Sequence, residues 1–171
     1  MLKLIGSILV IAGCAGIAGA FCRDLRQRIL LLKQIRKIYE DMKYYIAYQR
    51  ITVPDALLRL SENKALFLAD AFGEIYKEQR NGKQEFPFIW EQKIENALSE
   101  TALKLPEKKL LLEFPSCLGF MKDQAQAGAL DELLRETVQR IEELEEEQKS
   151  KNKMIMSLGL AGGIFISILL I

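Results

Sequence analysis

Two long apolar stretches lie near the ends of the chain, and they constrain its fold more than any other feature of the sequence. Leu4–Cys22 contains nineteen residues without a charge, and Met154–Ile171 contains eighteen. At about 1.5 Å of rise per residue, each stretch makes a helix of about 27–28 Å, close to the ~30 Å hydrocarbon core of a bilayer. We therefore predict transmembrane helices over residues 4–22 and 154–171, with one domain over residues 23–153 between them.

Basic residues border both apolar stretches on the side of the central domain. The residues that we expect to set the topology are Arg23, Arg26, Arg28, Lys149, Lys151 and Lys153. Positive clusters beside a span stay on the cytoplasmic side of the membrane. Both chain ends are then expected outside, and the central domain is expected in the cytoplasm.

A cleaved export signal is the alternative interpretation of the first stretch. Lys3 would supply its basic region, Ala18-Gly19-Ala20 resembles a cleavage site, and Ile11–Cys14 resembles a lipoprotein processing box. Against both, the basic region is a single lysine, and the apolar run continues past Cys14. The positive cluster that follows the stretch also favours a retained membrane helix.

Small residues recur four apart in both apolar stretches. The candidates for membrane helix packing are Ala12, Gly16 and Ala20 in the first stretch and Gly159 and Gly163 in the second. Small residues on one face let helix backbones approach closely in lipid. Two interpretations stay open: specific packing, most simply between the chain's own two spans, or the general abundance of glycine and alanine in membrane helices.

The central domain shows helical periodicity from its first residues. Apolar side chains at spacings of three and four form a stripe that comprises Leu25, Ile29, Leu32, Ile35, Tyr39, Met42 and Ile46. This stripe follows the first apolar stretch without a helix breaker, so one long helix is expected to leave the membrane. A second helix is expected after residue 52, because Thr52 can cap it, Pro54 suits its first turn and Asp55 suits its positive end.

Further helices are expected along the rest of the domain. Residues 64–83 predict one that stops at Asn81-Gly82, and Pro87 precedes another whose buried side comprises Phe88, Ile89, Trp90, Ile94 and Leu98. Pro106 opens a short helix that Pro115 ends or kinks. A final helix is expected from about Ala129 into the second apolar stretch. The predicted fold class is all-α: an antiparallel bundle of about six helices flanked by N- and C-terminal transmembrane helices, without a sheet.

Two clusters in the domain invite a binding interpretation. The acidic residues of 142–147 precede alternating lysines, and three tyrosines occur at positions 44, 45 and 48. A charge run of this kind is typical of a solvated helix, which is the interpretation that we favour. The tyrosines could form a stacking platform, but we expect them to be packing residues.

The chemistry-bearing residue types are sparse. Histidine is absent, the three cysteines have no CxxC spacing, and 24 basic against 23 acidic residues give no indication of a nucleic-acid partner. Gly82-Lys83 lacks the first glycine and the Ser or Thr of a phosphate loop, and neither apolar stretch holds a charge that would mark a transport path. We therefore predict no catalytic, cofactor-binding or metal site, no small-molecule substrate, and a protein that is not an enzyme.

The order of several segments resembles the stage III sporulation protein AB family of endospore-forming bacteria. These segments are the opening MLKLIG, PDALLRL from Pro54, WEQKIENAL from Trp90, KKLLLEFPSCLG, the Asp123/Gln126 region, and the closing SLGLAGGIFISILLI. Each is a common helical pattern by itself. Their length, order and placement together carry the resemblance over nearly the whole chain.

This resemblance implies a component of the channel assembly between mother cell and forespore, in the mother-cell membrane that surrounds the forespore. The domain is then similar to the helical domains of type II secretion F and type IV pilus platform proteins. The implied partners are a secretion-type ATPase, other components of the channel complex and the lipid bilayer. The competing interpretation is a membrane-tethered structural or regulatory adaptor that binds a partner other than an ATPase.

Overall fold

The computed structural model describes an all-helical chain. It describes the backbone over residues 2–82, 84–118 and 123–170, and the side chains over residues 23–82, 84–116, 128–155 and at 157. No strand occurs within the described backbone. The predicted all-α class is therefore confirmed.

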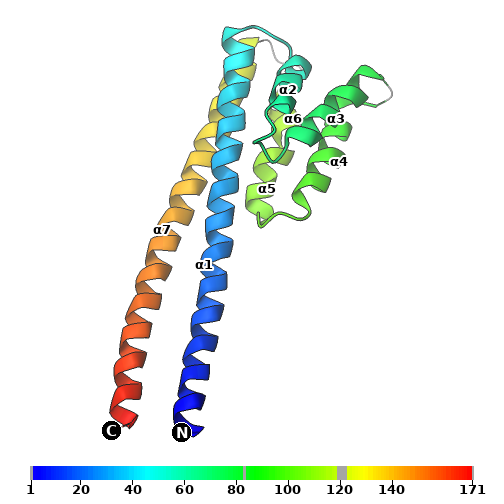
Figure 1. The fold of residues 1–171 in the computed structure, drawn as a ribbon. Helices are drawn as coiled ribbons and strands as arrows, with labels where there is room; N and C mark the ends of the chain where they lie inside the picture. Colours follow the sequence, from blue (N-terminus) through cyan, green and yellow to red (C-terminus); the bar gives the residue numbers. More distant parts are fainter. Residues whose placement is uncertain (1, 83, 119–122, 171) are drawn as a thin grey trace. The chain divides into compact units, whose positions relative to one another are not determined.

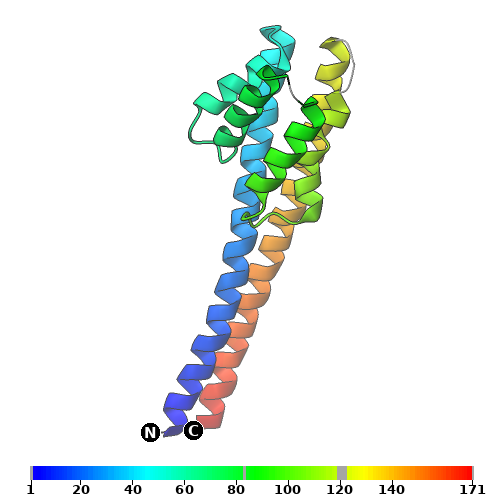
Figure 2. The same cartoon turned by 90° about the vertical axis from the view of Figure 1, so that its right-hand side faces the viewer.

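The chain divides into two compact units. The first unit combines Met1–Ile29 with Glu142–Ile171, and the second comprises Leu30–Ile141. Within the first unit, the beginning of α1 (Leu2–Lys43) lies beside the end of α7 (Asp123–Leu170) in both views (Figures 1 and 2). Each of these helices is continuous across its whole range, as the sequence predicts, although α7 begins earlier than the expected Ala129.

The predicted membrane spans fall largely outside the described side chains. Within the residues whose side chains are described, no helical stretch is long and apolar enough to cross a bilayer. Residues 4–22 and most of residues 154–171 are not among them.

The second unit is a series of short helices between the long ones. In chain order they are the π-helix η1 (Tyr44–Tyr48), α2 (Val53–Glu62), α3 (Ala69–Arg80), α4 (Phe86–Leu98), α5 (Leu105–Leu112) and α6 (Phe114–Leu118). Neighbours in sequence pack together: α2 on α3, α3 on α4, and α4 on both α5 and α6 (Figure 1). Short connections between antiparallel neighbours are typical of helical bundles.

The predicted start of α2 and end of α3 are both confirmed. The Thr52 hydroxyl accepts a hydrogen bond of 3.4 Å from the Asp55 backbone N–H, and Pro54 lies in the first turn. Helix α3 ends at Arg80 with Asn81 as its C-cap, and Gly82 adopts a φ of 65°, a conformation that L side chains rarely adopt.

Helix α3 starts at Ala69, five residues later than the sequence predicts. The segment before it forms turns, in which the Ala65 N–H donates to the Asn63 side chain at 3.2 Å and the Phe67 N–H donates to Gln34 at 3.0 Å. These side chains satisfy backbone donors that a helix would otherwise satisfy. The turn therefore depends partly on a residue of α1 that lies 33 positions away.

The apolar stripe of α1 and η1 is buried along its whole length, as predicted. The buried side of α4 also matches the prediction at Ile89, Trp90, Ile94 and Leu98, but Phe88 is 55% exposed. Two residues along an α-helix correspond to about 200°, so Phe88 lies on the face opposite Trp90. The prediction that Phe88 is buried was wrong.

An aromatic cluster joins the helices of the second unit. The ring of Trp90 stacks on Phe114 with centroids 4.5 Å apart and lies 5.9 Å from Phe72. Its indole N–H donates a 2.8 Å hydrogen bond to the Leu111 carbonyl, while the Tyr39 hydroxyl donates to the Leu110 carbonyl at 2.5 Å. These bonds hold α1 and α4 against the end of α5. Helix α5 ends just before Pro115, as predicted.

Candidate functional site

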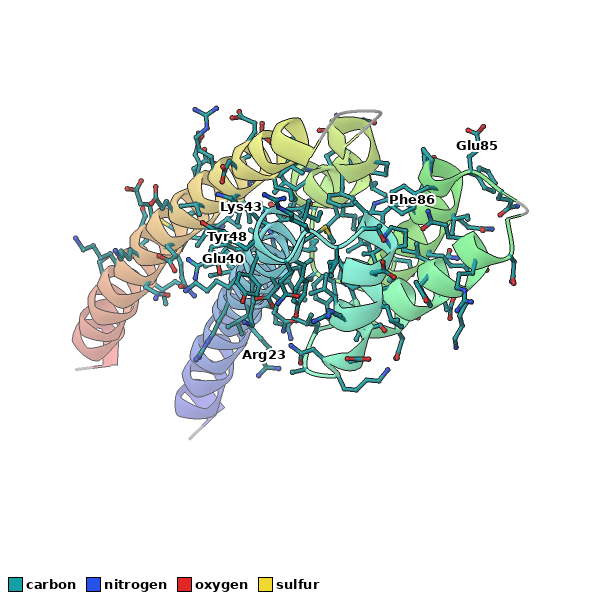
Figure 3. All side chains as sticks on the ribbon, turned by 90° about the horizontal axis from the view of Figure 1, so that it is seen from above. Arg23, Glu40, Lys43, Tyr48, Glu85 and Phe86 are labelled. Atoms are coloured by element: carbon teal, nitrogen blue, oxygen red, sulfur yellow. The ribbon has the colours of Figure 1, made fainter. Side chains whose placement is uncertain are left out.

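The basic residues predicted to set the topology belong to the first unit and differ in exposure. Arg23 and Arg26 on α1 and Lys149 and Lys153 on α7 are exposed, and Figure 3 shows Arg23 projecting from its helix. Lys151 is half-buried, and its Nζ lies 2.6 Å from the Glu147 carboxylate. Arg28, by contrast, is buried. The sequence pattern did not distinguish Arg28 from the others.

The contacts of the small residues proposed for membrane packing lie outside the described part of the structure. Ala12, Gly16, Ala20, Gly159 and Gly163 lie outside the residues whose side chains and close surroundings are described. Their role in helix packing therefore stays a prediction.

The acidic run on α7 matches the favoured interpretation of a solvated helix. Glu142, Glu143 and Glu146 are exposed, whereas Leu144 on the same turns is buried. One apolar face and one charged face are what an amphipathic helix presents.

The tyrosines of η1 are more exposed than the sequence analysis expects. Tyr48 is 76% exposed and Tyr44 is 52% exposed, and their rings stack with centroids 5.9 Å apart. Tyr45, whose centroid is 5.9 Å from that of Tyr44, is half-buried, and Ile46 alone of the five residues is buried. The expectation that all three tyrosines pack in the core was wrong for Tyr44 and Tyr48.

Tyr44 and Tyr48 each lie two residues from the buried Ile46, which is about 200° around a helix, so they face the opposite side; the helix type also changes here. The Gln49 N–H donates to the Tyr44 carbonyl at 3.2 Å, which spans five residues where an α-helix spans four. The wider turn alters the angular spacing of the side chains, so the stripe followed from α1 ends at Ile46. Single π-turns of this kind occur frequently at functional sites.

The backbone just beyond η1 is strained. Arg50 has a φ of 52°, within the left-handed region, and it is the one non-glycine residue with positive φ in the described backbone. Such a conformation costs on the order of 1 kcal/mol or more. It reverses the chain direction between η1 and α2.

A surface groove of about 630 Å³ lies between η1 and α2. Its lining comprises Tyr45, Ile51, Asp55, Leu58, Arg59 and Glu62, and we call it the tyrosine groove together with the exposed rings of Tyr44 and Tyr48. The Arg59 guanidinium lies 5.6 Å from the centre of the Tyr45 ring, a cation–π arrangement. Figure 3, which looks down on the end of α1, shows Tyr48 close to Lys43 and Glu40. The sequence analysis identified the cluster of tyrosines, but it predicted neither their exposure nor the groove beside them.

Ion pairs join helices of the second unit at several positions. Lys43 Nζ lies 2.5 Å from Asp131 Oδ1 and links α1 to α7 within the second unit. Lys93 on α4 lies 2.7 Å from Glu78 and 3.0 Å from Glu74 on α3, and hydrogen bonds to Glu78 and then Glu74 raise the pKa of Lys93. A hydrogen bond from Lys64 lowers the pKa of Asp70. These pairs contribute to packing within the second unit.

Two residues of the groove lining, Tyr45 and Arg59, are of types that are common at protein-binding surfaces. Tyrosine and arginine are enriched where protein interfaces gain most of their affinity. In the described part of the chain, no three carboxylate or cysteine side chains converge as ligands for a metal ion.

Comparisons with known proteins agree over nearly the whole length. Residues 3–171 match the family model described as stage III sporulation protein AB. The chain is also 22% identical over 170 residues to the Stage III sporulation protein AB of Bacillus subtilis (strain 168), with 99% of each chain covered. No solved structure matches it.

Proposed function

Because the chain belongs to the stage III sporulation protein AB family, we propose that it is a non-enzymatic membrane adaptor of the channel between mother cell and forespore. In this role it couples a secretion-type ATPase in the mother-cell cytoplasm to membrane components of the channel. The second unit meets the ATPase, and the first unit lies in and next to the mother-cell membrane that surrounds the forespore.

The continuity of the two long helices is the observation that supports coupling best. Helix α1 runs from Leu2 to Lys43 and α7 from Asp123 to Leu170, each extending through residues of both units. Coupling between distant sites travels through rigid secondary elements. A displacement of the second unit by a bound ATPase would therefore reach the first unit through two unbroken helices.

The sequence supports placement of the first unit in the membrane. Residues 4–22 and 154–171 have the length and apolar character of two spans, and Arg23, Arg26, Lys149 and Lys153 are exposed beside them. With these charges on the cytoplasmic side, both spans place the second unit in the mother-cell cytoplasm.

Co-purification tests the proposed coupling. The full chain is solubilised in mild detergent from membranes of sporulating cells and captured by a C-terminal tag, and the secretion-type ATPase of the channel is quantified in the eluate. We expect the ATPase at near-stoichiometric amounts, and only background amounts with an unrelated two-span protein. Equal amounts in both eluates would contradict the proposal.

A membrane-tethered adaptor for a different partner is the second candidate, because the tyrosine groove would suit protein partners other than an ATPase. Replacement of both apolar stretches by unrelated spans of equal length discriminates between the two. A tether tolerates the exchange, whereas a transmitter that packs on channel components loses sporulation. Retained sporulation together with absent ATPase would favour the tether.

A further inference from the structure

We propose that the tyrosine groove receives a basic segment of a partner protein, with arginine side chains on the exposed tyrosine rings and beside the groove carboxylates Asp55 and Glu62. This inference rests on the proposed function in one respect, namely that the chain acts by binding proteins. It specifies the chemistry of the partner at one surface, whether or not that partner is the ATPase.

The charge of the groove favours a basic partner. Asp55 and Glu62 are exposed, and neither forms an ion pair with another described residue. Asp55 accepts a 2.6 Å hydrogen bond from the Thr52 hydroxyl, which fixes its carboxylate at the start of α2. The one basic side chain in the lining, Arg59, already lies over Tyr45. The groove therefore offers two carboxylates that lack a cation.

The aromatic rings favour arginine among basic side chains. Tyr44 and Tyr48 stack on one another and remain exposed, so they present a preformed aromatic surface. A guanidinium stacks on aromatic faces and pairs with carboxylates at the same time, which an ammonium does less well. Arg59 on Tyr45 shows this contact within the chain itself.

The surface differs from other exposed apolar residues of the second unit. Leu105 and Phe88 are as exposed as Tyr48 and Tyr44, respectively, but no ring contact joins Phe88 to another described aromatic residue. Single exposed apolar side chains are normal on protein surfaces, whereas clusters mark interaction sites. Strained Arg50 beside the cluster is consistent with a binding loop.

Site-specific photo-crosslinking tests the inference. The full chain carries p-benzoylphenylalanine in place of Tyr48, or of Leu105 as the control, since both side chains are 76% exposed. Sporulating cells are irradiated, and the segment joined to residue 48 is identified by mass spectrometry. We expect at least a five-fold higher yield at position 48 than at 105, with a segment of another protein that contains arginine. An acidic or uncharged segment, a lipid, a second copy of this chain, or equal yields at both positions would overturn the inference.

Charge removal provides a second readout that does not depend on the tyrosines. In the chain that carries the probe at position 48, Asp55→Asn with Glu62→Gln should reduce the yield at least five-fold. Glu85→Gln, at an exposed position before α4 (Figure 3), should leave it unchanged. An undiminished yield in the double variant would contradict the ionic contribution.

The two proposals can fail separately. ATPase that co-purifies while position 48 gives no basic crosslink overturns the inference and leaves the coupling role standing. A basic crosslink to a protein other than the ATPase, with no ATPase co-purified, supports the inference and contradicts the coupling role.

Discussion

Arg140 of α7 donates two hydrogen bonds, of 2.9 and 3.2 Å, to one oxygen of the fully buried Glu107 carboxylate on α5. The other oxygen accepts from the backbone N–H of Lys104 at 2.5 Å, where α5 begins. A single carboxylate therefore caps one helix and binds a second, 33 residues away in sequence. Because Glu107 is fully buried and Arg140 is partly exposed, substitutions of the two residues should change stability by different amounts.

Removal of Arg140 should cost more stability than neutralisation of Glu107. Arg140→Met leaves a charged, fully buried carboxylate without its cation, which we expect to lower the free energy of unfolding by about 3 kcal/mol. Glu107→Gln keeps one acceptor oxygen, so it can accept from Arg140 or from the Lys104 N–H but not from both. It leaves no buried charge, and Arg140, which is 30% exposed, keeps access to water, so a loss of about 1–2 kcal/mol is expected. Fluorescence of Trp90, the single tryptophan, measures both in the detergent-solubilised full chain. Equal losses would show that burial of Glu107 does not govern the energetics.

The aromatic cluster should be sensitive to a cavity at Phe114. This side chain is fully buried between Tyr39 and Trp90, so Phe114→Ala should destabilise the second unit by about 3–5 kcal/mol. Phe88→Ala is the matched control on an exposed ring, and a change within about 0.5 kcal/mol is expected there. Urea unfolding followed by Trp90 emission gives both values. Comparable losses from the two substitutions would contradict the described core.

Arg50 and Arg59 should respond to glycine with opposite signs. Arg50→Gly relieves the left-handed backbone strain and should raise the free energy of unfolding by about 0.5–1 kcal/mol. Arg59→Gly, at an exposed position of α2, should lower it by about 1 kcal/mol through loss of helix propensity. Both are measured by the same unfolding assay. A destabilising Arg50→Gly would mean that its backbone is not strained in the folded chain.

The Lys93 bridge should give an alkaline pH dependence. Since Glu78 and Glu74 raise the pKa of Lys93 in the folded chain, its stabilisation is complete below the ordinary lysine pKa and is lost as the pH rises through the raised value. The difference in unfolding midpoint between the wild type and Lys93→Met should therefore shrink in strongly alkaline buffer. Lys93→Arg stays charged in the same buffer, so its unfolding midpoint should remain above that of Lys93→Met. If the midpoint difference between the wild type and Lys93→Met is the same at every pH, the Lys93 charge does not contribute to stability in this way.

Local signals were sufficient for much of the fold. The three-and-four spacing from Leu25 to Ile46 predicted a buried stripe, Thr52 and Pro54 predicted the start of α2, and Asn81-Gly82 predicted the end of α3. Each of these depends on residues within a few positions of one another, where side-chain spacing and capping decide the structure.

The features that were missed depend on distant residues or on a change of helix type. Gln34 stabilises the turn before α3 from another helix, and Arg140 accounts for the burial of Glu107. The π-turn at the end of α1 is not indicated by residue spacing, although the exposure of Tyr44 and Tyr48, each two residues from Ile46, agrees with helical spacing. The tyrosine groove depends on how η1 packs against α2, so it could not be recognised from sequence.

An ATPase of the mother-cell cytoplasm can reach the second unit only if that unit faces the same compartment. Glu100 follows α4 and is exposed, so a chain with its native cysteines replaced by alanine and Glu100→Cys presents one reactive thiol there. A membrane-impermeant maleimide is added to intact protoplasts of cells that express the chain but hold no forespore, so that the chain lies in the outer cell membrane, before and after permeabilisation. We predict labelling only after permeabilisation. Equal labelling of intact protoplasts would place the second unit outside the cytoplasm and contradict the adaptor role.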